Sequence, residues 1–173
     1  MNIHPLFVHF PIGLLVAYSV LEVGAYLVPA LRRQAWVSSV KAFLLFTGAL
    51  AAFAAIITGG MAEDLIQGHN LRAFILKVHE PFANATTLTY LVLAAAYLVR
   101  VFDQKGWGDR IVGTHSFLMR TWNMKKRVAH LILDTWLAPL FALLGLGLLT
   151  VTGGLGAALV YGPDVDPFVS FVY

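Results

Sequence analysis

The sequence predicts an all-α integral membrane protein, a four-helix bundle whose two termini both lie on the periplasmic side. Composition is the first reason: 59% of the 173 residues are apolar and 12% are charged, whereas soluble domains have about 45–50% and about 25%. A mean hydropathy of +0.77 leaves too much apolar surface for a polar shell to cover. The second reason is that four segments reach the roughly 20 apolar residues that a membrane span needs.

The expected spans are residues 11–28, 40–61, 83–102 and 131–160, within a single domain that covers 1–173. The first span lacks a basic leader and a small-residue cleavage site, and further spans follow it, so we expect it to be retained. Pro139 predicts a kink early in the fourth span. Two spans carry small residues at helical spacing, which favours close helix packing in lipid. These residues are Gly48, Ala52, Ala55 and Gly59 in the second span, and Gly147, Thr150, Gly154 and Ala157 in the fourth.

The basic residues predict the orientation. Ten of the twelve Lys and Arg residues lie on the side of the connections 29–39 and 103–130, and only Arg72 and Lys77 lie on the side of the termini. Because cytoplasmic loops carry the excess of Lys and Arg, we expect the termini outside a bacterial cytoplasmic (inner) membrane. Connection 103–130 mixes basic and apolar residues, which predicts an amphipathic helix on anionic lipid. Topology alone accounts for these bases, so no nucleic-acid partner is expected.

Histidine is the residue type that points to a cofactor. The chain has six histidines and no cysteine, so thiolate sites and covalent c-type haem are excluded. In the third span, His79 heads a semi-polar stripe on one helix face: His79, Ala83, Thr86, Tyr90, Ala94 and Tyr97. In the first span, His9 is followed one turn deeper by Gly13.

Two imidazoles from facing helices, with Gly13 and Ala83 leaving room beside them, suit a b-type haem held by two histidines. We therefore predict His9 and His79 as ligands of the haem iron, with His4 and His69 as substitutes or supporting partners. No catalytic centre is predicted.

Other interpretations stay open at this stage. Both histidines also suit an interfacial position with no special role, and the small residues suit plain packing. Glu22 would either reach toward Arg32 or Arg33, or act as a buried proton relay. His115 and His130 are candidates for a second haem. The histidines and carboxylates on the side of the termini suggest a metal site, but no ligand-spacing motif occurs among them.

The most distinctive string is the opening His4-Pro5-Leu6-Phe7-Val8-His9-Phe10-Pro11. It resembles the signature His-Pro-x-x-Val-His-Phe-Pro of a family of small bacterial inner-membrane proteins of unknown function. The resemblance extends to Thr58-Gly59, His79, Gly153-Gly154 and Leu159-Val160-Tyr161, and departs at the tail, residues 162–167, whose role is left open. The two prolines predict that the first span starts near Pro11, after an extended or turn segment.

What the resemblance implies is a four-helix membrane protein, some members being linked to c-type cytochromes. The sequence thus predicts a membrane electron-transfer subunit that binds b-type haem near the periplasmic face. Its partners would be a c-type cytochrome, a respiratory complex or quinone. The alternatives are a cofactor-free accessory subunit of a larger membrane complex and, less favoured, a metal or solute transporter. If Thr86, Tyr90 and Tyr97 pack against a helix and leave no cavity, the accessory subunit gains support.

Overall fold

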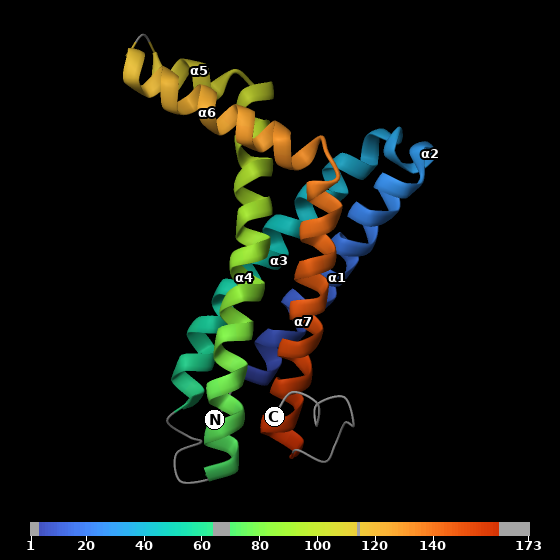
Figure 1. Ribbon diagram of the computed structural model, residues 1–173, viewed down its shortest axis with the longest axis vertical. Helices are drawn as coiled ribbons and strands as arrows, with labels where there is room; N and C mark the ends of the chain where they lie inside the picture. Colours follow the sequence, from blue (N-terminus) through green and yellow to red (C-terminus); the bar gives the residue numbers. More distant parts are fainter. Residues whose placement is uncertain (1–3, 64–69, 114, 163–173) are drawn as a thin grey trace.

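The chain folds into four long helices and three shorter ones, as a computed structural model that describes residues 4–63, 70–113 and 115–162 shows (Figure 1). In order these are α1 (His4–Leu27), α2 (Pro29–Arg32), α3 (Ala35–Glu63), α4 (Asn70–Gln104), α5 (Trp107–Val112), α6 (Ser116–Leu133) and α7 (Leu137–Tyr161). Within these ranges there is no strand. The all-α prediction is therefore confirmed.

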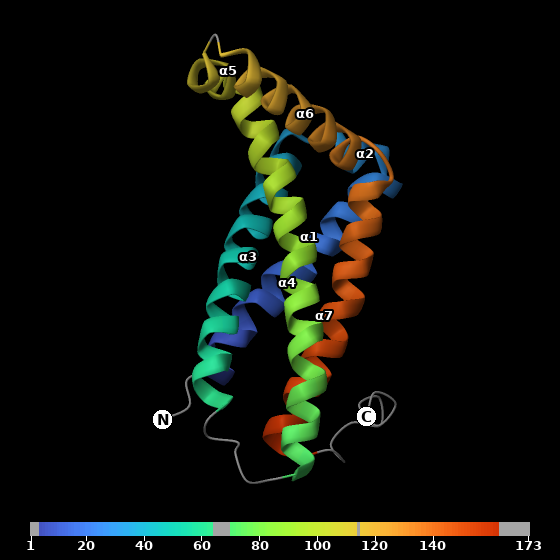
Figure 2. The ribbon, with the colours of Figure 1, turned by 60° about the vertical axis from the view of Figure 1, so that its left-hand side comes forward.

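Four helices are long and apolar enough to cross a membrane, over Phe7–Leu27, Ala35–Met61, Arg72–Gln104 and Leu137–Tyr161. At about 1.5 Å per residue, even the shortest of these stretches, with 21 residues, is about 31 Å long and covers a hydrocarbon layer of about 30 Å. They run lengthwise through the molecule (Figures 1 and 2). The start of α1 and the end of α7 lie at one end, and α2, α5 and α6 lie at the other.

The bundle consists of two antiparallel hairpins, α1 with α3 and α4 with α7, which pack against each other. Its centre contains Leu15, Tyr18, Leu45, Tyr90 and Leu93, all fully buried. Glycines let the backbones approach. A Cβ on Gly48 of α3 would lie 2.6 Å from Leu15 Cδ2 of α1, and one on Gly145 of α7 would lie 2.7 Å from Tyr90 Cζ of α4. Small residues thus set the packing within the bundle, as expected for helices in lipid.

Helices α5 and α6 form a separate layer across the end of the bundle (Figure 1). Gly106 adopts the left-handed conformation, with φ of 65°, and allows the sharp turn from α4 into α5. Trp122 of α6 packs on Gly108, where any Cβ would lie 1.9 Å from the indole ring. Its Nε1 donates a hydrogen bond to Asp109 Oδ1 at 3.0 Å. The other face of α6 exposes Phe117, Met124, Val128 and Leu131. The 103–130 connection therefore contains an amphipathic helix, as predicted.

Two expectations about helix ends are wrong. Helix α1 begins at His4 and continues through Pro11, so the segment before Pro11 is helical and not extended. In the fourth span, residues 131–133 belong to α6 and the membrane helix begins at Leu137. Pro139 is then the third residue of α7, where the missing N–H has no intrahelical partner to lose, and it does not kink the helix.

Candidate functional site

The candidate site lies where α1 and α4 begin, at the end of the bundle opposite α6. His4 of α1 lies 3.1 Å through Nδ1 from Thr58 Oγ1 of α3. The ring rests against Gly59, where a Cβ would lie 3.2 Å from its Cε1 atom. Burial lowers the pKa of His4 below its ordinary value, against a smaller opposing effect of the Ala55 backbone. The neutral imidazole is thereby favoured, which is the form that binds a metal.

His79 of α4 approaches the same region from the other hairpin. Its ring lies beside Gly156 of α7, where a Cβ would be 3.5 Å from Cε1, and close to the backbone of Thr152. The Nδ1 atom of His79 is buried, and the described part of the chain provides no hydrogen-bond partner for it. His79 and His4 are near enough to interact electrostatically. We refer to His4, Thr58, Gly59, His79 and Gly156 together as the histidine site.

The structure brings His4 close to His79, whereas the predicted pairing of His9 with His79 stays a prediction. His9 follows His4 by five positions, and at about 100° per residue the two side chains point about 140° apart around α1. With His4 toward Thr58, His9 is exposed, and Gly13 one turn further along the same face is exposed as well. Residues 9, 13, 17 and 20 thus form an outward face of α1.

The other predicted site residues have mixed outcomes. Ala83 is half-buried, one turn along α4 from His79. His69 lies outside the described residues. His115 is exposed at the start of α6. His130 is exposed between Asp103 Oδ2, 3.6 Å from its Nε2, and Asp134 Oδ2, 2.8 Å from its Nδ1. Among the described residues, no group of three or more His, Asp and Glu side chains forms a metal site.

The stripe of α4 that follows His79 is buried from Thr86 to Tyr97. Thr86 pairs with Thr152 of α7, with 3.0 Å between the two hydroxyl oxygens. The Tyr90 hydroxyl lies 2.8 Å from Ser19 Oγ of α1. Helices α1 and α7 therefore cover this part of α4 directly, and the stripe packs the bundle.

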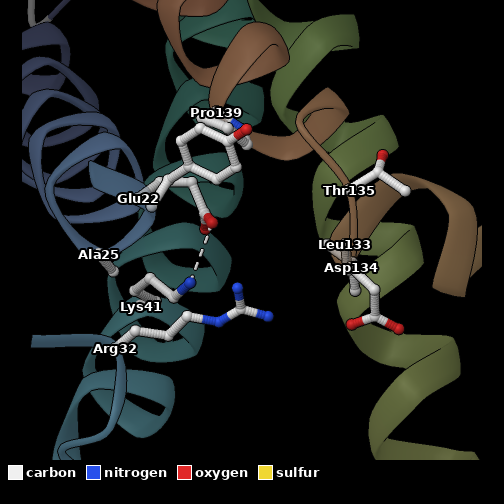
Figure 3. A pocket seen from close by; sticks show the side chains of 9 residues that line it. Glu22, Ala25, Arg32, Lys41, Leu133, Asp134, Thr135 and Pro139 are labelled. Carbon is white, nitrogen blue, oxygen red and sulfur yellow. Dashed lines mark hydrogen bonds and ion pairs between the residues drawn. The ribbon is translucent and has the colours of Figure 1, made fainter. Parts of the chain in front are cut away.

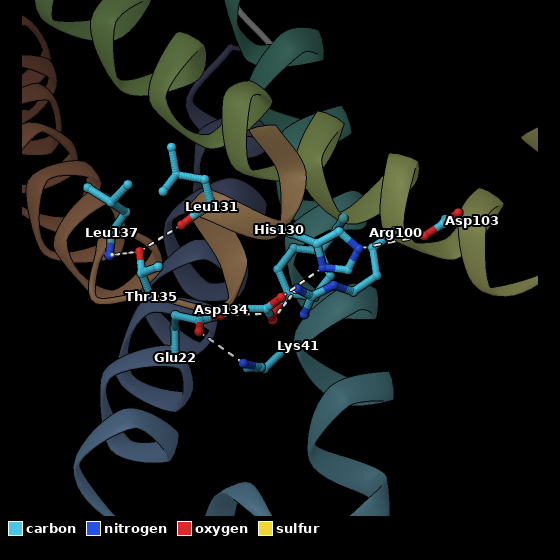
Figure 4. A network of polar contacts seen from close by, with 10 residues as sticks. Glu22, Lys41, Arg100, Asp103, His130, Leu131, Asp134, Thr135 and Leu137 are labelled. Carbon is cyan, nitrogen blue, oxygen red and sulfur yellow. Dashed lines mark hydrogen bonds and ion pairs between the residues drawn. The ribbon is translucent and has the colours of Figure 1, made fainter. Parts of the chain in front are cut away.

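A buried ion pair lies further along the bundle, toward α6 (Figure 4). Glu22 of α1 is 5% exposed. Its Oε1 accepts a hydrogen bond from Lys41 Nζ of α3 at 2.9 Å, and its Oε2 accepts one from the Tyr97 hydroxyl of α4 at 2.9 Å. The predicted contact of Glu22 with Arg32 or Arg33 is therefore replaced by one with Lys41. Ionisable groups inside a membrane protein are costly unless they are paired in this way.

Tyr18 joins the two parts of this polar interior. Its ring meets Tyr90 and Tyr97 edge to face, with centroids 6.2 Å and 6.4 Å away. Such pairs contribute about 0.5–1.5 kcal/mol beyond their buried area. The Tyr18 hydroxyl is buried, and no described residue bonds to it.

At the α6 end, Asp134 ties the start of α7 to α4 and α6. It accepts hydrogen bonds from Arg100 of α4 and from His130 of α6 (Figure 4). Partial burial raises the pKa of Asp134, but these hydrogen bonds outweigh it and hold the pKa below its ordinary value. The carboxylate form is thereby stabilised.

The partners of His4 and Glu22 on α3 were not predicted from the sequence. They could have been found from the register of the α1–α3 hairpin, that is, from which residues are equally distant from the turn. The pairs His4 with Thr58, Leu15 with Gly48, and Glu22 with Lys41 are each centred on the same turn, near Leu31. Two antiparallel helices that meet at one short turn pair residues equally distant from it. Placing the turn at 29–33 would thus have predicted that His4, and not His9, faces the end of α3.

A bundle of four apolar helices with its polar groups enclosed defines a multi-pass membrane protein. Over residues 1–166 the chain matches the model of a family described as "Predicted membrane protein (DUF2231)". The chain belongs to this family, and the resemblance carried by its opening motif is confirmed. No curated protein and no solved structure matches the chain.

Proposed function

We propose that the protein is a membrane electron-transfer subunit that binds a b-type haem at the histidine site. The observation that carries the proposal is the His79 ring, whose buried Nδ1 is without a hydrogen-bond partner among the described residues while His4 lies nearby. A buried polar atom without a hydrogen-bond partner costs about 1–3 kcal/mol of stability, unless a bound ligand interacts with it.

The residues at the histidine site fit haem in their chemistry. His4 and His79 would hold the haem from two separate helices, and Gly59 and Gly156 let the two rings lie close to α3 and α7. A haem held by His4 and His79 would supply one-electron transfer. Thr58 orients the His4 ring through its hydroxyl, in the way that outer partners orient ligating histidines. His4 takes the role that sequence reasoning gave to His9.

The expected orientation in the membrane is consistent with electron-transfer partners on the side of the histidine site. The excess of Lys and Arg at the α2 and α5–α6 end favours a cytoplasmic position for that end. The histidine site would then lie near the periplasmic face of a bacterial inner membrane. A c-type cytochrome, a respiratory complex or quinone would then exchange electrons with the haem there.

Three single variants test the ligands, with His9→Ala as the matched control. His79→Ala and His4→Ala should each lower the bound haem or change the reduced-minus-oxidised spectrum of the purified protein. His9→Ala should leave both unchanged, because His9 is exposed on the opposite side of α1. Loss of haem on His9→Ala, with retention on His4→Ala, would refute the assignment of ligands.

The second candidate is a cofactor-free accessory subunit of a larger membrane complex. The direct packing of Thr86 on α7 and of Tyr90 on α1 supports it, because a polar stripe that is fully covered by neighbouring helices needs no cofactor. The two candidates differ in one measurement. An accessory subunit purified with adequate haem supply would show no haem absorption, and its histidine variants would change only its stability or its assembly.

A further inference from the structure

A small cavity opens at the α6 end of the bundle, between α1–α2 on one side and the α6–α7 connection on the other (Figure 3). Its volume is about 40 Å³. The lining residues are Glu22, Ala25, Tyr26, Arg32, Lys41, Leu133, Asp134, Thr135 and Pro139. Most of these residues carry a charge or a hydroxyl group.

Of the charged side chains around the cavity, one cation has no acidic partner among the described residues. Lys41 neutralises Glu22 at 2.9 Å, and Arg100 with His130 holds Asp134. For Arg32 the described residues offer no carboxylate within ion-pair distance. Figure 3 shows its guanidinium extending from α2, beside Lys41, toward the side of Asp134. Within the lining, Arg32 and Lys41 balance Glu22 and Asp134. Arg100, which holds Asp134 from outside the lining, brings the immediate surroundings to one positive charge.

The cavity lies at the level where a membrane changes from hydrocarbon to headgroups. The membrane stretch of α1 ends at Leu27 and that of α7 begins at Leu137, and cavity residues come from both ends. Tyr26 and Trp136 are exposed at the same level, as aromatic residues of the interface are. Leu27 and Leu140 are exposed beside it and present apolar surface to acyl chains.

We propose that this cavity binds the phosphate of an anionic phospholipid headgroup, with Arg32 as its main donor. Arginine binds phosphate through two parallel N–H···O bonds, which are among the strongest hydrogen bonds in proteins. The positive end of the α7 dipole, beside Thr135 and Pro139, adds to the attraction. The cavity is too small for a whole lipid, so the glycerol and acyl chains would lie along the exposed flanks of α1 and α7.

Arg33 provides a matched control, because it is the neighbouring exposed arginine and does not line the cavity. The experiment measures binding of phosphatidylglycerol and phosphatidylcholine to the purified protein by native mass spectrometry. Wild-type protein should retain phosphatidylglycerol in preference to phosphatidylcholine. Arg32→Gln should lower that affinity by about tenfold, as expected for loss of a charge-assisted pair, and Arg33→Gln should leave it nearly unchanged.

Three results would overturn the proposal: no preference for phosphatidylglycerol in the wild type, equal losses in both arginine variants, or displacement of the lipid by inorganic phosphate at equal concentration. The last result would identify a site for the free anion. Arg32→Lys keeps the charge but not the planar fork, and should bind with intermediate affinity. It also serves as the folded comparison if Arg32→Gln is unstable.

Discussion

Replacement of Lys41 by methionine tests the buried ion pair with Glu22. The side chains are 15% and 6% exposed, respectively, so solvent screens the pair only weakly. Methionine fills a similar volume but leaves the Glu22 carboxylate with one donor, the Tyr97 hydroxyl. Removal of one partner of a buried pair costs about 3–5 kcal/mol, because the remaining charge is uncompensated. We expect Lys41→Met to lose about that much stability.

The double variant Lys41→Met with Glu22→Gln should recover most of this loss. The neutral amide oxygen still accepts from Tyr97, and no charge remains buried. Replacement of a buried pair by neutral groups is often neutral or stabilising by about 1–4 kcal/mol. Glu22→Gln alone should cost less than Lys41→Met, because Lys41 lies near the start of α3 and its long side chain can reach water.

The assay is unfolding of the purified protein by sodium dodecyl sulfate in mixed micelles, followed by far-ultraviolet circular dichroism. The four variants of the cycle give the coupling free energy between the two residues. A coupling below about 0.5 kcal/mol would equal that of a surface pair and would refute the reasoning.

Three further predictions follow from the packing and the charges. Gly145→Ala should destabilise the bundle by about 1–3 kcal/mol in the same assay, because the new methyl group meets Tyr90, whereas Gly147→Ala has nothing within 4 Å and should be neutral or slightly stabilising. Because the pKa of Asp134 is lowered in the folded protein, Asp134 stabilises the fold at pH values above the ordinary carboxyl pKa of 3.8, and this stabilisation is lost as the pH falls through the pKa of the folded state. Measurement of the unfolding midpoint as a function of pH checks this. Asp134→Asn should remove the pH dependence. A reporter fused to the C-terminal end should be active only outside the cytoplasm, and cytoplasmic activity would reverse the topology.

The sequence predicted the four membrane helices because their length and hydropathy are direct consequences of the bilayer thickness. It also predicted the buried face of α4, since His79, Thr86, Tyr90 and Tyr97 are polar groups that lipid would not accept. On α4, hydroxyl and imidazole groups therefore indicate which face points into the bundle.

The face of α1 was harder to predict, because lipid-facing and core-facing positions are both apolar in a membrane helix. Gly13, one turn after His9, was predicted to leave room for a haem inside the bundle, yet it is exposed. The inward face is marked instead by Tyr18, Ser19 and Glu22, and His4 falls on the same side. Polar residues were thus the better guide to the interior than small ones.

Lys41 was missed as the partner of Glu22 because it was grouped with the loop bases that report topology. Its distance from the turn near Leu31 equals that of Glu22, so hairpin register would have joined them. The predicted small-residue face of α7 was wrong at Gly147 and Thr150, which are exposed, while Gly145, which was not part of that face, is buried. Hydropathy does not distinguish two glycines on one helix.

The optical spectrum of the purified protein, oxidised and then reduced, tests the haem assignment most directly. Wild-type protein produced with adequate haem should show the Soret and α bands of a low-spin b-type haem, and His79→Ala should lose them. Absence of these bands from the wild type, under conditions in which a control b-type cytochrome keeps its haem, would contradict the proposal.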